Sequence, residues 1–240
     1  MSPRHKQFCN LWRNVERATS NQNLSMASLG LVKRKNCRVL TIRGWIVLFI
    51  VATAILLIAI PAVHPFLAVD HPVHGEILIV EGWLPDYAME EAMREFKAQR
   101  YNLLVTTGGP LMGGSHLSEY KTYAELGAAT LKKLGFDEKL IVAVPAQSVI
   151  EDRTYASAVA LKNWLLDSRS AVKSLNVYSF GPHARRTWLL FDKVLGDKIA
   201  VGVIAAEDRS YDPRKWWTSS NGARSVIDEM IAYCYARLFF

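Results

Sequence analysis

The chain has 240 residues and a formal net charge of +7, and half of its residues are hydrophobic. This length allows one ordinary domain with a sizeable core, but two domains only with difficulty. The positive charge is concentrated, since residues 1–43 carry nine Lys and Arg side chains against one acid, whereas residues 44–240 hold 20 basic and 21 acidic ones. The near-neutral remainder argues against a nucleic-acid-binding domain, for which a basic surface is expected.

Residues 45–63 (WIVLFIVATAILLIAIPAV) contain no charged side chain. As a helix they would span about 28 Å, close to the hydrocarbon thickness of a bilayer. The alternatives are a buried core helix and the apolar region of a cleaved signal peptide. A core helix is rarely apolar all round, and no convincing small-x-small cleavage site follows. The pattern therefore predicts one transmembrane helix.

The basic residues lie on the N-terminal flank of this segment, and the positive-inside rule places that flank in the cytoplasm. We therefore expect a basic cytoplasmic tail over residues 1–44, a juxtamembrane linker over 64–75 and an α/β domain over 76–240. The protein is predicted to cross the inner or plasma membrane once, with its C-terminal domain in the periplasm or otherwise outside the cytoplasm. The lipid bilayer is then its first partner.

The domain contains a single cysteine, Cys234, because Cys9 and Cys37 fall in the predicted tail. No disulfide framework or cysteine-based metal site is available within the domain. Since Cys234 lies in a helical apolar pattern, we expect it to be a small buried hydrophobic residue.

Beyond residue 75, short apolar runs alternate with helical patterns, which is typical of a parallel sheet covered by helices. The expected strands cover residues 77–81, 103–107, 140–144, 175–180 and 199–205. The expected helices cover residues 86–100, 117–134, 149–166, 182–195 and 223–238. Short, continuously apolar strands are typical of a sheet covered on both faces. We predict an α/β, Rossmann-like fold with an open, mostly parallel sheet of about five strands, helices on both faces, and one preceding transmembrane helix.

Polar residues gather where four of the expected strands end. In open parallel sheets, ligands bind beyond the carboxyl ends of the strands, because loops and helix N-termini converge there. The candidate ligand-binding residues at these ends are Glu81, Gly82, Thr107, Gly108, Gly109, Asp152, Arg153, Thr154, Ser179, Arg185 and Arg186. The candidate catalytic residues are Glu119 and His183.

The glycine pair Gly108-Gly109 would let the backbone approach a ligand closely, although a simple strand-to-helix turn explains it equally well. No Gly-x-Gly-x-x-Gly follows the first strand, and no Gly-Lys-Ser/Thr closes the loop, so neither a dinucleotide nor a P-loop nucleotide is expected. Glu119 lies near an expected helix start, where the helix dipole alone favours a carboxylate.

Ser148 and Glu151 have capping-box spacing, which indicates a structural role. Asp152 and Arg153 form either an anion-binding pair or a surface ion pair. His183, followed by Arg185 and Arg186 at a helix start, suits phosphate or carboxylate recognition with a general acid or base at hand; the alternative is a polar helix-start residue.

Two further motifs have mainly structural interpretations. His71-x-x-His74 lies in the linker without further ligands, so no metal site is expected. The pair Trp216-Trp217 marks either an interface or, more simply, packing against the domain.

Residues 76–206 resemble the YdcF-like family, also called the SanA/ElyC group, which is built on domain of unknown function 218. Four motifs in order carry the resemblance: Thr107-Gly108-Gly109, Ser118-Glu119, Arg153-Thr154, and a Ser-His-Arg pattern from Ser179 to Arg186. The chain departs from the family at Glu81-Gly82-Trp83, at Arg153 and at Ala156-Ser157, which places it in a divergent branch.

The resemblance implies a Rossmann-like domain with a role in cell-wall or surface-polysaccharide biogenesis and no settled reaction. One relative is associated with S-adenosylmethionine, but a cytoplasmic cofactor would not reach an exported domain, so no cofactor is expected. Two hypotheses follow. The first is an enzyme that acts on a phosphorylated envelope precursor, such as a lipid-linked sugar, and the second is a non-catalytic envelope factor that acts through a protein partner.

Overall fold

The computed structural model describes residues 41–168 and 171–240. The chain divides into two compact units, residues 1–50 and 51–240, and helix α2 (Ile42–Leu67) contributes residues to both. Among the described residues, α2 is the one helix long and apolar enough to cross a membrane. Its most apolar stretch has a mean hydropathy of 3.0, and none of that stretch is buried.

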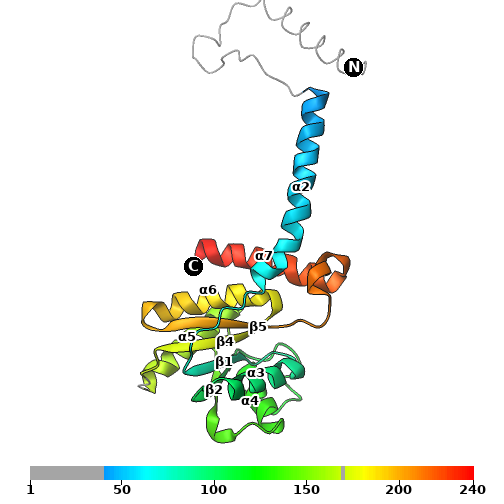
Figure 1. Cartoon of the computed structure of the whole chain (residues 1–240). Helices are drawn as coiled ribbons and strands as arrows, with labels where there is room; N and C mark the ends of the chain where they lie inside the picture. Colours follow the sequence, from blue (N-terminus) through cyan, green and yellow to red (C-terminus); the bar gives the residue numbers. More distant parts are fainter. Residues whose placement is uncertain (1–40, 169–170) are drawn as a thin grey trace, which may run out of the picture. The chain divides into compact units, whose positions relative to one another are not determined.

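The domain is built on an open sheet of five parallel strands in the order β3-β2-β1-β4-β5 (Figure 1). The strands are β1 (Ile77–Glu81), β2 (Leu103–Gly108), β3 (Ile141–Pro145), β4 (Ser174–Phe180) and β5 (Ala200–Ala206). The predicted fold class is confirmed. From β1 the chain adds β2 and β3 on one side, and it then adds β4 and β5 on the other side. The connections that follow β1 and β4 therefore run in opposite directions. In sheets of this kind, ligands bind in the crevice between two such connections.

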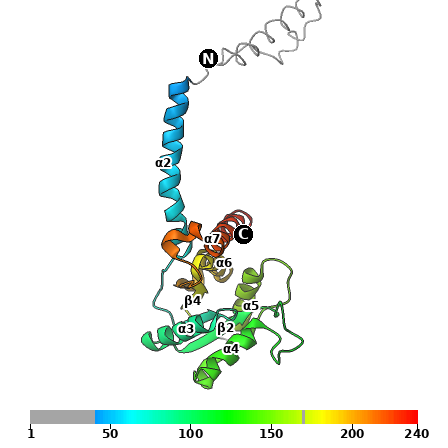
Figure 2. The same cartoon turned by 90° about the vertical axis from the view of Figure 1, so that its right-hand side faces the viewer.

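Helices cover both faces of the sheet, with α3 and α4 on one face and α5 and α6 on the other (Figures 1 and 2). Their bounds are α3 (Asp86–Ala98), α4 (Tyr123–Lys133), α5 (Arg153–Asp167) and α6 (Ala184–Leu195). Successive side chains of a strand point to opposite faces of the sheet, so the core has one part on each face. Leu78 and Leu104 pack against α3 and α4, whereas their neighbours Ile79 and Val105 pack against α5 and α6.

A third layer lies over α6 and consists of the 3-10 segment η5 (Pro213–Thr218) and helix α7 (Ser220–Phe239). The last turns of α2 pack on this layer through a small core of Leu67, Trp216 and Val226. The indole nitrogen of Trp216 donates a hydrogen bond to the carbonyl of Ile60 at 3.1 Å. Trp216 is therefore a packing residue, whereas Trp217 is 43% exposed.

Three other short 3-10 turns lie in the described part of the chain. They are η2 (Glu138–Leu140), η3 (Gly181–His183) and η4 (Gly196–Lys198). Of these, η3 positions the candidate site, because it turns the chain from β4 into α6.

The linker between α2 and β1 is joined to the sheet. His71 forms an antiparallel bridge with Val203, and the side chain of Asn176 holds Val73 through both of its backbone groups at 2.8 Å. The imidazole of His71 also packs against the Trp188 ring, 5.0 Å away. Among the described residues, no group of three or more His, Cys, Asp or Glu side chains is placed to hold a metal ion.

Three local predictions are wrong. Helix α4 begins at Tyr123 and not near residue 117, because Thr122 and Glu125 form a reciprocal capping box. The capping box expected at Ser148 and Glu151 is absent, since α5 begins only after Asp152, whose backbone is left-handed with φ 54°. Cys234 is exposed on α7 instead of buried.

Candidate functional site

Polar side chains close the carboxyl ends of β1 and β4 on the α5–α6 face. Glu81 is the last residue of β1, and its carboxylate accepts a hydrogen bond from the Ser179 hydroxyl at 2.6 Å. The Thr187 hydroxyl of α6 lies 3.5 Å from the other carboxylate oxygen and 3.2 Å from Ser179. All three residues are buried, so the Glu81 carboxylate is held by protein groups and not by bulk water.

His183 occupies the turn from β4 into α6. Gly181, with φ +44°, and Pro182 shape the η3 turn that places the imidazole over Glu81. Its Nε2 lies 3.4 Å from a Glu81 oxygen, and its Nδ1 lies 2.8 Å from a Glu229 oxygen. The Trp83 ring packs edge-on against it at 5.3 Å. The imidazole is thus held between two carboxylates and beside an aromatic wall.

Arg186 follows His183 by one helical turn and completes the arrangement. Its guanidinium binds Glu229 of α7 through two hydrogen bonds, 2.9 Å from Nε and 3.0 Å from Nη2, in the two-pronged geometry typical of strong Arg–carboxylate pairs. The same Nη2 lies 2.9 Å from Nδ1 of His183, so both donors converge on one Glu229 oxygen. A third nitrogen reaches the Thr154 hydroxyl at the start of α5 at 3.4 Å, and that hydroxyl lies 3.5 Å from Nε2 of His183.

These seven residues are called the His183 cluster below. Its members come from β1, β4, η3, α5, α6 and α7, and they are Glu81, Thr154, Ser179, His183, Arg186, Thr187 and Glu229. The cluster brings together five of the predicted site residues.

The electrostatics of the cluster favour a charged imidazole. Burial lowers the pKa of His183, but the negative charges of Glu81 and Glu229 outweigh burial and raise that pKa to about 9. Burial raises the pKa of Glu229, but His183 and Arg186 outweigh it and lower that pKa to about 2. At neutral pH the imidazolium can therefore act as a general acid.

Thr107 adds an unusual feature beside the cluster. It pairs in register with Glu81, and it faces the α5–α6 side because it follows Val105 by two residues. Its hydroxyl is buried and is the one buried side-chain polar atom without a hydrogen-bond partner in the described part of the chain. A buried hydroxyl normally has a partner, so this position has unused hydrogen-bonding capacity.

The strand-end glycines pack against α4. A Cβ at Gly82 would lie 2.0 Å from the carbonyl oxygen of Tyr123, and a Cβ at Gly108 would lie 2.7 Å from the Tyr123 side chain. Close contact between the strand ends and α4 thus accounts for both glycines without a ligand. Gly109 differs, because a Cβ there would make only an ordinary contact of 3.8 Å.

The other predicted cations point elsewhere. Arg185 donates to the backbone carbonyl of Phe66, and its guanidinium lies 4.0 Å above the Phe66 ring, so it holds the end of α2. Arg153 is exposed and contacts the sulfur of Met112. Asp152 precedes α5 and lines, together with Arg186 and residues of α7, a hollow of about 330 Å³ beside the cluster.

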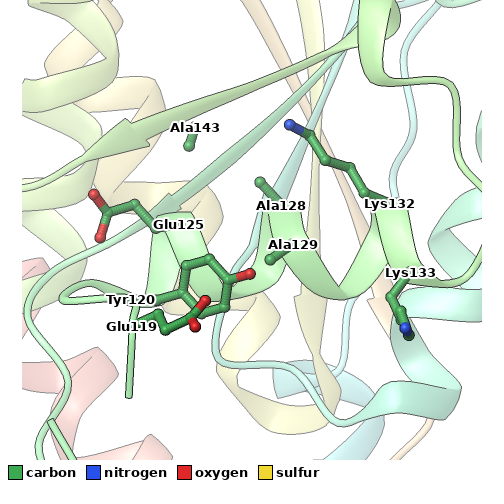
Figure 3. Close-up of a pocket in the computed structure, with 8 residues that line it drawn as sticks. All are labelled: Glu119, Tyr120, Glu125, Ala128, Ala129, Lys132, Lys133 and Ala143. Atoms are coloured by element: carbon green, nitrogen blue, oxygen red, sulfur yellow. The ribbon is translucent and has the colours of Figure 1, made fainter.

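Glu119 lies in the connection between β2 and α4, outside the His183 cluster. It is exposed and lines a hollow of about 620 Å³ along α4 and β3 (Figure 3). Glu119, Tyr120 and Glu125 gather at one end of this hollow, and Lys132 and Lys133 lie toward the other. None of its lining residues belongs to the His183 cluster, so the structure does not bring the two candidate catalytic residues together.

Sequence reasoning missed Glu229 and Thr187, and it noted Trp83 at the end of the first strand without assigning it to the site. A signal for Glu229 exists, since the inward face of α7 follows the spacing Val226, Glu229, Tyr233, with one acid among apolar residues. Such an acid requires a buried cation as its partner.

A comparison of the sequence with known protein families found none that matches, and a comparison with curated proteins found no significant match.

Proposed function

We propose that this protein is a membrane-anchored, YdcF-like domain protein of the cell envelope that binds an anionic, phosphorylated precursor at the carboxyl ends of its strands. Helix α2 is the anchor, the basic tail lies in the cytoplasm, and the domain lies on the other side of the bilayer. The length and hydropathy of α2 and the one-sided distribution of Lys and Arg support this topology.

The observation that carries the proposal is the convergence of His183, Arg186 and Thr154 at the start of α5 and α6. Helix N-termini favour anions, and an arginine beside a hydroxyl and an imidazolium provides the donors that a phosphate requires. The hollow beside Arg186 is large enough to admit a phosphate, and its other wall contains Ile231, Tyr235 and Phe240. These apolar side chains suit the lipid part of a lipid-linked precursor.

The His183 imidazolium would serve as the acid that protonates a leaving oxygen, with Glu81 and Glu229 keeping it charged and oriented. Arg186 and Thr154 would hold the phosphate, and Thr107 would offer a further hydroxyl. Glu119 stays a candidate for a second acid or base, at a separate hollow.

Isothermal titration calorimetry on the full chain in nanodiscs tests the proposal, with inorganic phosphate and a short-chain polyprenyl phosphate as probes. We expect binding of both, and we expect Thr154→Val to raise the Kd about tenfold, because it removes a hydrogen bond to charged groups. Thr130→Val is the matched control, since Thr130 is also a half-buried helical threonine but bonds only to the Leu126 carbonyl of its own helix. Absence of binding by the wild-type protein would overturn the proposal.

A second candidate function is a non-catalytic envelope factor that acts through a protein partner. The ion pairing of the cluster favours it, because Arg186 is already paired with Glu229 and ties α7 to α6. Complementation of a deletion strain separates the two. The first function predicts that His183→Gln fails to complement although the protein is present in the membrane, and the second predicts that it complements.

A further inference from the structure

The outer face of α7 is apolar and exposed. Ile231 is 65% exposed and Leu238 is 78% exposed. The exposed apolar residues repeat at helical spacing, and we call them the α7 stripe: Ile227, Ile231, Cys234, Leu238 and the adjoining Phe239. An exposed apolar surface of this kind usually has a partner.

The opposite face of α7 is fixed to the domain, so the stripe cannot turn inward. Glu229 is bound by His183 and Arg186, and Val226 and Ala236 are buried. The ring of Tyr233 packs edge-on against Phe66 at 5.5 Å. The orientation of the stripe is therefore set by the same contacts that build the His183 cluster.

The α7 layer lies beside the membrane-spanning stretch itself. Trp216 of η5 donates to the carbonyl of Ile60, and Ile60 and Val63 pack against the same small core as Val226 of α7. Both residues fall within the charge-free stretch 45–63. Figure 1 shows α7 running across the level of the C-terminal end of α2, and Figure 2, which views α7 nearly along its axis, shows it beside that end. A bilayer around α2 thus reaches the level of η5 and α7.

The composition of this layer suits a membrane interface. The exposed Trp217 neighbours the point where α2 would leave the lipid, and tryptophan is enriched at that depth. Residues 213–240 carry four basic side chains, Arg214, Lys215, Arg224 and Arg237, against Asp228 and the inward-facing Glu229. This balance favours contact with anionic headgroups.

We propose that η5 and α7 lie on the bilayer surface, with the α7 stripe inserted at the boundary between headgroups and acyl chains. The proposal rests on the anchoring by α2 proposed above. It places Ile231 and Tyr235, which line the hollow beside Arg186, next to the lipid. A lipid-linked substrate would reach the hollow directly from the leaflet.

Spin labelling of the full chain in nanodiscs containing anionic phosphatidylglycerol tests this. Cys9 and Cys37 are replaced by serine, and nitroxides are placed at the native Cys234 or, in a Cys234→Ser background, at I231C or L238C. L56C in α2 reports on anchoring, and L166C is the matched control, because Leu166 is a 68% exposed apolar residue at the end of α5. Relaxation by oxygen and by a water-soluble nickel complex gives the depth of each label.

We expect the α7 labels at about 5–10 Å below the headgroup surface, the label at residue 56 deeper, and the label at residue 166 in water. Aqueous α7 labels with a buried label at residue 56 would overturn the surface contact and leave the anchor standing. An aqueous label at residue 56 would overturn both. Strong dipolar coupling between labels at residue 231 of two copies would assign the stripe to a second copy and overturn the membrane contact.

Discussion

At the carboxyl ends of the strands, different kinds of residue cover the two faces of the sheet. On the α4 side, Gly82 and Gly108 let the backbone of Tyr123 sit directly on the strand ends. On the α5–α6 side, Glu81 and Ser179 carry polar side chains into a charged cluster. The difference lies in α7, because among the described residues only that side has a third layer, which brings a counter-charge, Glu229, to a buried cation. Buried charges at a strand end need an opposite charge from a further element, here α7. Close packing of backbone against glycine involves no charge and needs no such element.

The largest expected effect comes from removing that counter-charge. Glu229→Ala leaves His183 and Arg186 without their shared carboxylate, and breaking a buried ion pair in this way costs about 3–5 kcal/mol of unfolding free energy. Urea denaturation of the full chain in detergent, followed by tryptophan fluorescence, measures it. Glu90→Ala on the exposed surface of α3 is the control. A loss under about 1 kcal/mol would mean that α7 is not held by this pair.

The glycine-closed side gives the next largest effect. Gly82→Ala would place a methyl group against the Tyr123 carbonyl and should cost about 3 kcal/mol, the upper part of the range for overpacking. Gly113→Ala is the control, since nothing lies within 4 Å of a Cβ at that position. Equal melting temperatures for the two variants would contradict the close packing of α4 on the strand ends.

The His183 cluster also makes the stability of the domain depend on pH, which the glycine contacts with α4 do not. Because folding raises the pKa of His183 from 6.5 to about 9, its contribution to stability is complete below pH 6.5 and is lost as pH rises through 9. Folding lowers the pKa of Glu229 from 4.5 to about 2, so its contribution is complete above pH 4.5 and is lost as pH falls through 2.

The unfolding free energy should therefore be highest between about pH 4.5 and 6.5 and fall by on the order of 2 kcal/mol toward pH 9. Denaturation curves recorded from pH 5 to 9 give this profile. In His183→Gln the fall on the alkaline side should disappear, and if it persisted, another group would be its source.

The smallest expected effect concerns Thr107. Thr107→Val removes a buried hydroxyl that has no partner, so stability should be unchanged or higher by up to about 1 kcal/mol. The same variant should weaken phosphate binding if that hydroxyl contributes to the site. A clear loss of stability without added phosphate would instead show that the hydroxyl has a partner in the free protein.

Much of the fold follows from the sequence because it depends on local patterns. Apolar runs such as 77–81 and 175–180 have too few polar residues for an exposed sheet, and the helical patterns between them set the parallel connections. The helix starts were less predictable. Helix α4 begins late because Thr122 and Glu125 cap it, and Asp152 delays α5 through its left-handed backbone.

The candidate site was predictable only in part. Glu81 and Ser179 lie at the carboxyl ends of strands, and His183 follows one. Because the carboxyl ends of parallel strands meet at one edge of the sheet, the sequence predicts that these three residues lie close together. Glu229 lies 46 residues beyond His183, and its partnership depends on how α7 packs over α6, which no local pattern encodes. Arg185 and Arg186 are neighbours in sequence, yet helical geometry turns one toward Phe66 and the other toward Glu229.

The attachment of the linker to the sheet bears on how far an anchored domain can search. A free chain over residues 68–76 would have an end-to-end distance of about 16 Å and would let the domain swing about its anchor. Asn176 and Val203 hold Val73 and His71 in place, which removes that slack. If α2 is the anchor, as proposed above, the domain would meet only molecules that diffuse to it within the leaflet, and its rate of encounter would follow their lateral mobility instead of the motion of a tether.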